Sequence, residues 1–160
     1  MKQNKNNLIF KTLGMGAIAG MRSMTAPALL STALTHAPKE ALTRSPLRYL
    51  QYGPVATGLK VMAATELVGD KLPGAPDRIA APVLLPRAAS GALVGAAIFT
   101  LNHDNWLQGA AYGAAAAVAA TFGSYYLRKL MNRYAPNAFS GALEDMLTLA
   151  GGVALTKFKV

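Results

Sequence analysis

Long apolar runs separated by short polar gaps dominate this sequence. Five runs approach the roughly 20 mostly apolar residues that a membrane-spanning helix needs. The fourth run, WLQGAAYGAAAAVAATFGSYYL, has almost none of the polar face that a soluble amphipathic helix carries. The pattern therefore predicts an all-α fold in one domain, 1–160, as a polytopic transmembrane helical bundle. Its spans, about five in number, are expected at about 8–34, 53–69, 80–101, 106–127 and 139–156.

Proline and glycine residues are expected to shape these helices. Pro27 and Pro86 lie inside the first and third runs, where a proline removes a backbone donor and breaks or kinks a helix. The tetrapeptide SGAL, present at 90–93 and 140–143, hints at an internal repeat. Glycines four apart let two helix backbones approach closely, which predicts tight packing within one chain or, less favoured, a homodimer through the Gly-x3-Gly faces. The pairs are Gly16 with Gly20, Gly91 with Gly95, and Gly109 with Gly113.

The composition points to lipid as the surrounding medium. Charged residues make up 14% of the chain, against about 25% in an average soluble domain, and hydrophobic residues make up 52%. The formal net charge is +9, but the basic residues lie mainly in the gaps between apolar runs, as they do at membrane edges. They do not gather on one face among aromatic residues, so the sequence predicts a lipid bilayer as partner and no nucleic acid.

Residues that carry common catalytic chemistry are scarce. The chain has no cysteine, which excludes a disulfide framework, a thiolate zinc site and a cysteine nucleophile. The two histidines, His36 and His103, are too few for a histidine metal cluster. No phosphate-cradling loop, nucleotide fingerprint or Ser-His-Asp set is evident. Enzymatic activity is therefore uncertain and less expected than its absence, and no cofactor is predicted.

The N-terminus is predicted to be cytoplasmic. It begins like a signal peptide, but Lys11 and Arg22 interrupt the apolar stretch and indicate a retained first helix. Five spans would group eight basic residues on the N-terminal side, Lys5 and Arg128 among them, against five on the other side. Basic residues favour the cytoplasmic side, so this count favours the orientation by a small margin. A re-entrant first run would instead bring the basic gap at 36–48 to the N-terminal side.

Ionisable residues inside or beside the apolar runs are the candidate functional residues. An ionised side chain at the bilayer centre costs about 2.5–3.5 kcal/mol on insertion scales, so it normally faces a partner or water. Arg22 stands between apolar stretches, and Glu66 and Asp70 lie one helical turn apart on one face. Opposite charges on separate runs predict one polar site, formed by Arg22, Glu66, Asp70, Lys71, Arg78, Arg87, Glu144 and Asp145.

Simpler explanations exist for most of these charges. Glu66 and Asp70 would lie at the membrane surface if the second helix ended a few residues earlier, and Arg87 could reach the same surface with its long side chain. The acidic pair at 144–145 could stabilise the positive N-terminal end of the last helix. Arg22 is harder to place at a surface, and the sequence favours an ion pair for it within the bundle.

Three stretches carry a resemblance to a known family. They are GMRSMTAPALLS, ELVGDKLPGAPDRIAAPVLLPRAASGALVG and ALEDMLTLAGG. Together they resemble the DUF4126 family of small bacterial integral membrane proteins, and the likeness covers most of the chain. The resemblance implies a helical membrane fold in the bacterial cytoplasmic (inner) membrane, and it implies that the candidate charges belong to one pattern. The family's name marks an unknown function, so no activity follows from it.

Three hypotheses for function remain open. In the first, which is favoured, the protein is a small permease or channel whose charges surround a polar cavity for a small ion or anionic solute. In the second, it is a membrane-surface enzyme or binding protein that acts on lipid phosphates, with Mg²⁺ held by Glu66 and Asp70 and with Lys71 and Arg78 on the phosphate oxygens. In the third, it is a structural membrane subunit in which the charges only pin helices together.

Overall fold

The chain is described by a computed structural model that covers residues 4–36, 42, 45–69, 79–131 and 146–155. Every regular element in these residues is helical, which confirms the all-α class for the described part of the chain. Judged by length and composition, one described helix, α4, could cross a membrane, so the number of spans stays a prediction. The elements are α1 (Lys5–Met21), α2 (Thr25–Leu34), the 3-10 helix η2 (Pro46–Gln51), α3 (Gly53–Gly69), α4 (Ala81–Leu101), α5 (Trp106–Met131) and a C-terminal helix (Met146–Leu155).

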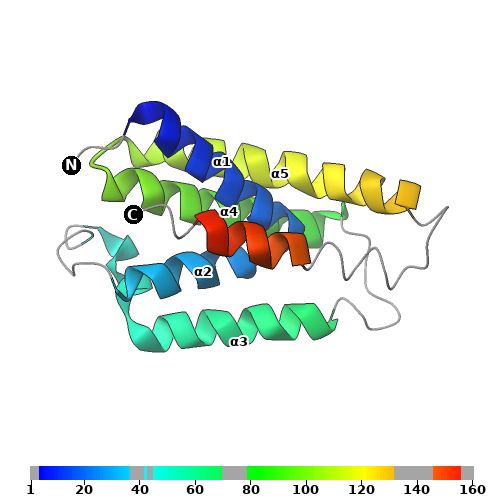
Figure 1. The fold of residues 1–160 in the computed structure, drawn as a ribbon, viewed down its shortest axis with the longest axis horizontal. Coiled ribbons are helices and arrows are strands. Elements are labelled where there is room, and N and C mark those ends of the chain that lie inside the picture. Colours follow the sequence, from blue (N-terminus) through cyan, green and yellow to red (C-terminus); the bar gives the residue numbers. More distant parts are fainter. Residues whose placement is uncertain (1–3, 37–41, 43–44, 70–78, 132–145, 156–160) are drawn as a thin grey trace.

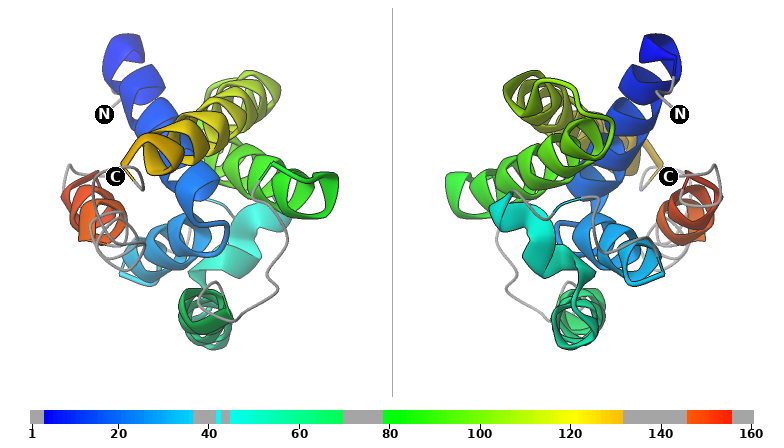
Figure 2. Two further views of the ribbon diagram at one scale, coloured as in Figure 1. Left: turned by 90° about the vertical axis from the view of Figure 1, so that its right-hand side faces the viewer. Right: turned by 90° about the vertical axis from the view of Figure 1, so that its left-hand side faces the viewer.

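Helices α1, α4 and α5 pack against one another and form one side of the bundle (Figure 1 and Figure 2). α4 runs antiparallel to α5, because Gly91 lies against Gly113 and Gly95 lies against Gly109. α1 runs parallel to α5, and a Cβ atom on Gly16 would approach the Gly113 carbonyl oxygen to 2.6 Å, which is closer than real Cβ contacts. The Gly-x3-Gly faces therefore pack tightly within the chain itself, and the homodimer stays a prediction.

The first apolar run, predicted as a single helix over about 8–34, is two helices. α1 ends at Met21, Arg22 is extended (φ −145°, ψ 111°), and α2 runs back along the bundle (Figure 1). Pro27 provides one physical reason, because in a continuous helix its ring would clash with the carbonyl of Ser23, four residues earlier. Pro27 instead occupies the first turn of α2, where a backbone N–H has no helical partner in any case.

This reversal changes the predicted grouping of basic residues. Because α1 and α5 are parallel, the start of α1 and the end of α5 lie at opposite ends of the bundle (Figure 1). Lys5 and Arg128 therefore lie at opposite ends of the bundle, whereas the count placed them on one side because it assumed that the first run is one helix. The cytoplasmic N-terminus itself stays a prediction.

Helices α2 and α3 form the other side of the bundle as an antiparallel pair (Figure 1). η2 joins them, and it is tied to α2 by the hydroxyl of Ser31, which donates to the Leu50 carbonyl oxygen at 2.6 Å. α3 lies along the edge and exposes apolar side chains on its outer face, among them Val61, Met62 and Val68. The rest of the chain therefore covers only one face of α3.

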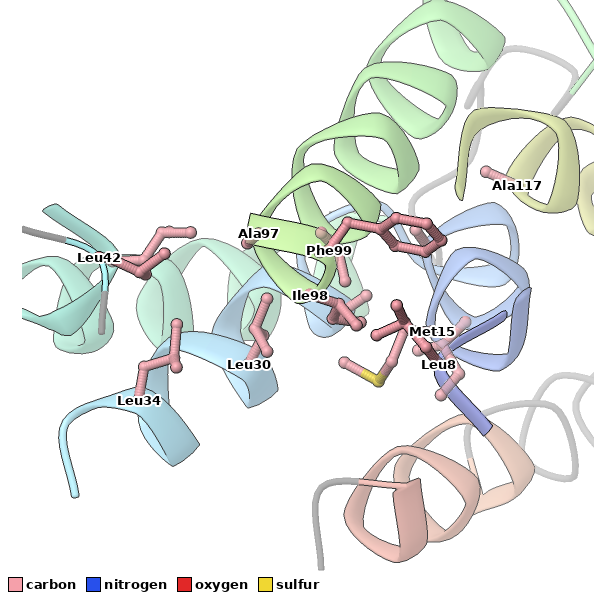
Figure 3. Packing of buried hydrophobic residues seen from close by; sticks show 14 residues of the cluster. Leu8, Met15, Leu30, Leu34, Leu42, Ala97, Ile98, Phe99 and Ala117 are labelled. Carbon is pink, nitrogen blue, oxygen red and sulfur yellow. The ribbon is translucent and has the colours of Figure 1, made fainter. Parts of the chain in front are cut away.

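The hydrophobic core lies where the two sides meet (Figure 3). Leu8 and Met15 of α1 pack in one cluster with Leu30 of α2 and Phe99 of α4, all buried. The Phe99 ring also contacts Tyr112 of α5, with 6.0 Å between ring centroids. The core therefore joins both sides of the bundle and fixes α1 and α2 on either side of the break that separates them.

Candidate functional site

The carboxylate of Glu66 holds the point where α1 breaks and α2 begins. Its Oε1 accepts two hydrogen bonds from Ser23, one from the backbone N–H and one from the hydroxyl, both at 2.8 Å. Its Oε2 accepts the backbone N–H of Met24 at 2.9 Å. These N–H groups directly precede the first turn of α2, at the positive end of the helix dipole. Glu66, on α3, therefore supplies the N-terminal cap that α2 lacks from its own Met24.

Arg22 returns a comparable contact to α3. Its side chain is 3% exposed, and its Nη1 donates to the backbone carbonyl oxygen of Glu66 at 3.4 Å. Glu66 is among the last four residues of α3, whose carbonyl groups have no partner within the helix. The break and the end of α3 thus satisfy each other's backbone groups: the carboxylate of Glu66 accepts N–H groups of the break, and the guanidinium of Arg22 donates to a carbonyl at the end of α3.

Arg87 holds the α1 side of the break from α4. Its side chain is 2% exposed, and its Nη1 donates to the carbonyl oxygen of Gly20 at 2.9 Å. The hydroxyl of Thr121, on α5, donates to the same oxygen at 2.9 Å. A positive charge beside the final carbonyl groups of α1 is favourable, because that end of the helix dipole is negative. Side chains of α4 and α5 therefore cap the end of α1.

The carbonyl of Ser23, inside the break, also has a partner. It accepts a hydrogen bond from the hydroxyl of Ser90 on α4. The first turn of the C-terminal helix lies close by, because the hydroxyl of Thr148 is 3.9 Å from the sulfur of Met21. Four helices, α3, α4, α5 and the C-terminal helix, thus contact the break between α1 and α2. We call this region the break site and define it by Gly20, Arg22, Ser23, Met24, Glu66, Arg87, Ser90 and Thr121.

The structure brings together three of the predicted site residues: Arg22, Glu66 and Arg87. The other five lie outside the described residues, so the structure does not test them; they are Asp70, Lys71, Arg78, Glu144 and Asp145. Ser23, Ser90 and Thr121 were not predicted. In the sequence, each of them is a hydroxyl residue within an apolar run. This is a weak indication of a site, because such hydroxyl groups also donate hydrogen bonds within their own helix, as Thr121 does to the carbonyl of Ala117.

Most of the acceptor capacity of the Glu66 carboxylate is already used. Both of its carboxylate oxygens already accept hydrogen bonds from Ser23 and Met24. Among the described residues, no group of three or more His, Cys, Asp or Glu side chains is placed to hold a metal ion. Asp70, the other proposed ligand, lies outside those residues. The hypothesis of Mg²⁺-dependent chemistry on lipid phosphates therefore gains no support from Glu66 as it lies here.

Comparison with known proteins agrees with the resemblance noted in the sequence. The model of the family described as "Domain of unknown function (DUF4126)" matches residues 9–158. The chain belongs to the DUF4126 family. Searches of curated proteins and of solved structures found no match. The matched residues include every residue of the break site. The DUF4126 description assigns no activity to the family, so the geometry of the break site is the main evidence on function.

Proposed function

We propose that this protein is a small permease or channel of the cytoplasmic membrane, in which the break site interacts with a small ion or anionic solute. The observation that carries the proposal is an interrupted helix inside the bundle, with two buried guanidinium groups and a carboxylate around it. At membrane depth, non-helical backbone is tolerated only where protein buries it or where it lines a water-filled cavity. Helix ends that meet inside a bundle form the binding sites of many transporters.

Exposed apolar side chains support a position within the bilayer. Val68 on α3, Leu85 on α4 and Leu127 on α5 are each more than half exposed. Large apolar surface of this kind on several outer helices is unusual for a soluble monomer. Lipid tails would cover these side chains without the need for a protein partner.

The aromatic residues of α5 support the same position. Trp106 and Tyr126 are both more than half exposed, and they lie 20 positions apart on one continuous helix. At 1.5 Å per residue this separation is about 30 Å, which matches the hydrocarbon thickness of a bilayer. Arg128 and Lys129 follow after one intervening residue, as basic residues do outside an aromatic belt.

The donors of the break site fit a solute with negative charge. Two consecutive backbone N–H groups and one hydroxyl converge on the Glu66 carboxylate at the start of α2. Helix starts of this type bind carboxylate and phosphate groups, because their N–H groups and dipole both favour an anion. In the proposed mechanism, a passing anion interacts with these donors while the Glu66 side chain moves aside.

A flux assay tests this function. We would reconstitute the purified chain in vesicles loaded with potassium chloride or potassium formate and measure anion efflux. We expect efflux above that of protein-free vesicles, and a loss of efflux of about tenfold or more for Glu66→Gln, equivalent to about 1.4 kcal/mol in the barrier. Lys60→Gln, an exposed change on the same helix, is the matched control and should leave efflux unchanged. If the protein keeps its helical content but its vesicles release anion no faster than protein-free vesicles, the permease is refuted.

A structural subunit is the second candidate, and one observation favours it. Three hydrogen bonds to the Glu66 carboxylate attach α3 to the break. A charge whose role is only to stabilise the fold would make such contacts. This alternative predicts that Glu66→Gln lowers the yield of folded protein, while the unmodified protein gives no efflux for either anion. The same vesicle experiment, with folded yield recorded, therefore separates the two candidates.

A further inference from the structure

One exposed cluster lies away from the break site, on η2 at the end of the bundle where α2 is connected to α3. Tyr49 and Tyr52 are 56% and 54% exposed, and their rings stack with 5.9 Å between centroids. The guanidinium carbon of Arg48 lies 5.3 Å from the centroid of the Tyr49 ring. We call these three side chains the η2 platform. Nothing in the break site or its proposed mechanism uses them.

The backbone beneath the η2 platform is firmly held. Ser45 caps η2 by accepting the N–H of Leu47 at 3.3 Å, and Pro46 fixes the first turn. Leu50 points into the core and is 6% exposed, while its carbonyl oxygen accepts the hydroxyl of Ser31. The outward direction of the three platform side chains is therefore set by the buried face of the same helix, rather than by a frayed end.

We propose that the η2 platform binds the phosphate group of an anionic phospholipid at the bilayer surface. Arginine can donate two parallel hydrogen bonds to phosphate oxygens, and tyrosine rings favour the headgroup level of a membrane. α3, whose outer face exposes apolar side chains, begins directly after Tyr52. It also lies at the same end of the bundle as the start of α5, where Trp106 is exposed (Figure 1). The proposal rests on the membrane location argued above, but not on transport.

Electrostatic coupling inside the η2 platform provides a specific readout. A hydrogen bond from Arg48, together with its positive charge, lowers the pKa of the Tyr49 phenol, because the guanidinium favours the phenolate. A phosphate bound to Arg48 would offset that charge and draw away its donors. We therefore expect anionic lipid to raise the pKa of Tyr49 toward its ordinary value, as measured by phenolate absorbance against a Tyr49→Phe reference.

The main experiment counts bound lipid. We would release the full chain from nanodiscs that contain phosphatidylcholine with or without phosphatidylglycerol, and measure retained lipid by native mass spectrometry. We expect preferential retention of phosphatidylglycerol, reduced about fivefold by Arg48→Gln and partly preserved by Arg48→Lys, which keeps the charge without the fork. Lys60→Gln, which removes another exposed positive charge, from α3, should leave retention unchanged.

Each outcome has a defined meaning. Equal retention by the unmodified protein and by Arg48→Gln would overturn the lipid site. Displacement of phosphatidylglycerol by millimolar inorganic phosphate would also overturn it, because the site would then recognise a free anion. Absence of anion efflux, with the lipid preference intact, would refute the permease and leave the η2 platform as proposed. Extraction of the protein from cell membranes without detergent would remove the basis of both proposals.

Discussion

Two segments of the chain combine a proline with a buried arginine inside an apolar run, yet only one of them breaks its helix. In GMRSMTAP the chain leaves the helix at Arg22 and begins a new helix before Pro27. In LLPRAASG, Pro86 lies inside α4, which continues through it to Leu101. The two segments look alike in the sequence, so proline content alone does not explain which helix breaks.

The position of each proline within its helix explains part of the difference. Pro86 is the sixth residue of α4, so the carbonyl with which it would clash, that of Pro82, lies in the first turn. Pro27 would follow a long helix, and a clash at the carbonyl of Ser23 would fall in its interior. Near a helix start the chain can adjust around a proline, whereas in the interior the helix has to kink or end.

The availability of partners explains the rest. The break frees backbone groups on both sides, and side chains of three other helices meet several of them: Glu66 from α3, Arg87 and Ser90 from α4, and Thr121 from α5. Arg87 can reach Gly20 because α4 stays continuous beside the end of α1. The unbroken helix therefore serves as a support for the broken one, and the two arginines have different roles although their surroundings in the sequence are similar.

The largest expected loss of stability comes from removing the carboxylate that caps α2 at the break site. Glu66→Ala deletes the acceptor of three hydrogen bonds and leaves the N–H groups of Ser23 and Met24 without it. We expect a loss of about 3 kcal/mol in the free energy of unfolding, because hydrogen bonds to a charged group are strong and partly buried donors are costly to leave unsatisfied. Thermal unfolding in detergent, followed by circular dichroism, measures the loss. Lys60→Ala serves as the control, and equal melting temperatures for the two variants would contradict the capping role.

A smaller loss of stability is expected where α1 packs closely against α5. A Cβ atom at Gly20 would overlap the carbonyl group of Ala117 on α5, so Gly20→Ala has to push the two helices apart. We expect a destabilisation of about 1–3 kcal/mol. Gly58→Ala is the matched control, since nothing lies within 4 Å of a Cβ atom there, and it should be neutral or stabilising by up to about 1 kcal/mol. If both substitutions had the same effect, close glycine packing would not be what holds α1 to α5.

Sequence reasoning predicted much of the chemistry and less of the geometry. The all-α class followed from the apolar runs, and burial of Arg22 followed from its place between apolar stretches, whereas the sequence left Arg87 open between a buried position and the membrane surface. The reversal at Arg22 was left as an alternative, because a break depends on partners that come from distant parts of the chain. Glu66 lies 42 positions from Met24, and no local pattern indicates that its carboxylate caps α2. Contacts of this range are set by helix packing, which the sequence periodicity does not specify.

The smallest expected change in stability comes from Pro27→Ala. This variant separates the two causes of the break, which are the proline itself and the side chains, such as Glu66, that hold the freed backbone groups. If Glu66 and its neighbours hold the break, Pro27→Ala should keep the hairpin and change stability by no more than about 1 kcal/mol. Since the chain has no cysteine, spin labels at Phe10→Cys and His36→Cys, both exposed positions, report the geometry directly. A continuous helix would separate these positions by about 39 Å, whereas the hairpin gives a clearly shorter distance. Pro86→Ala, in the unbroken helix, should leave that distance unchanged. A shift toward the longer distance in Pro27→Ala alone would show that the proline, rather than the capping carboxylate, keeps α1 and α2 apart.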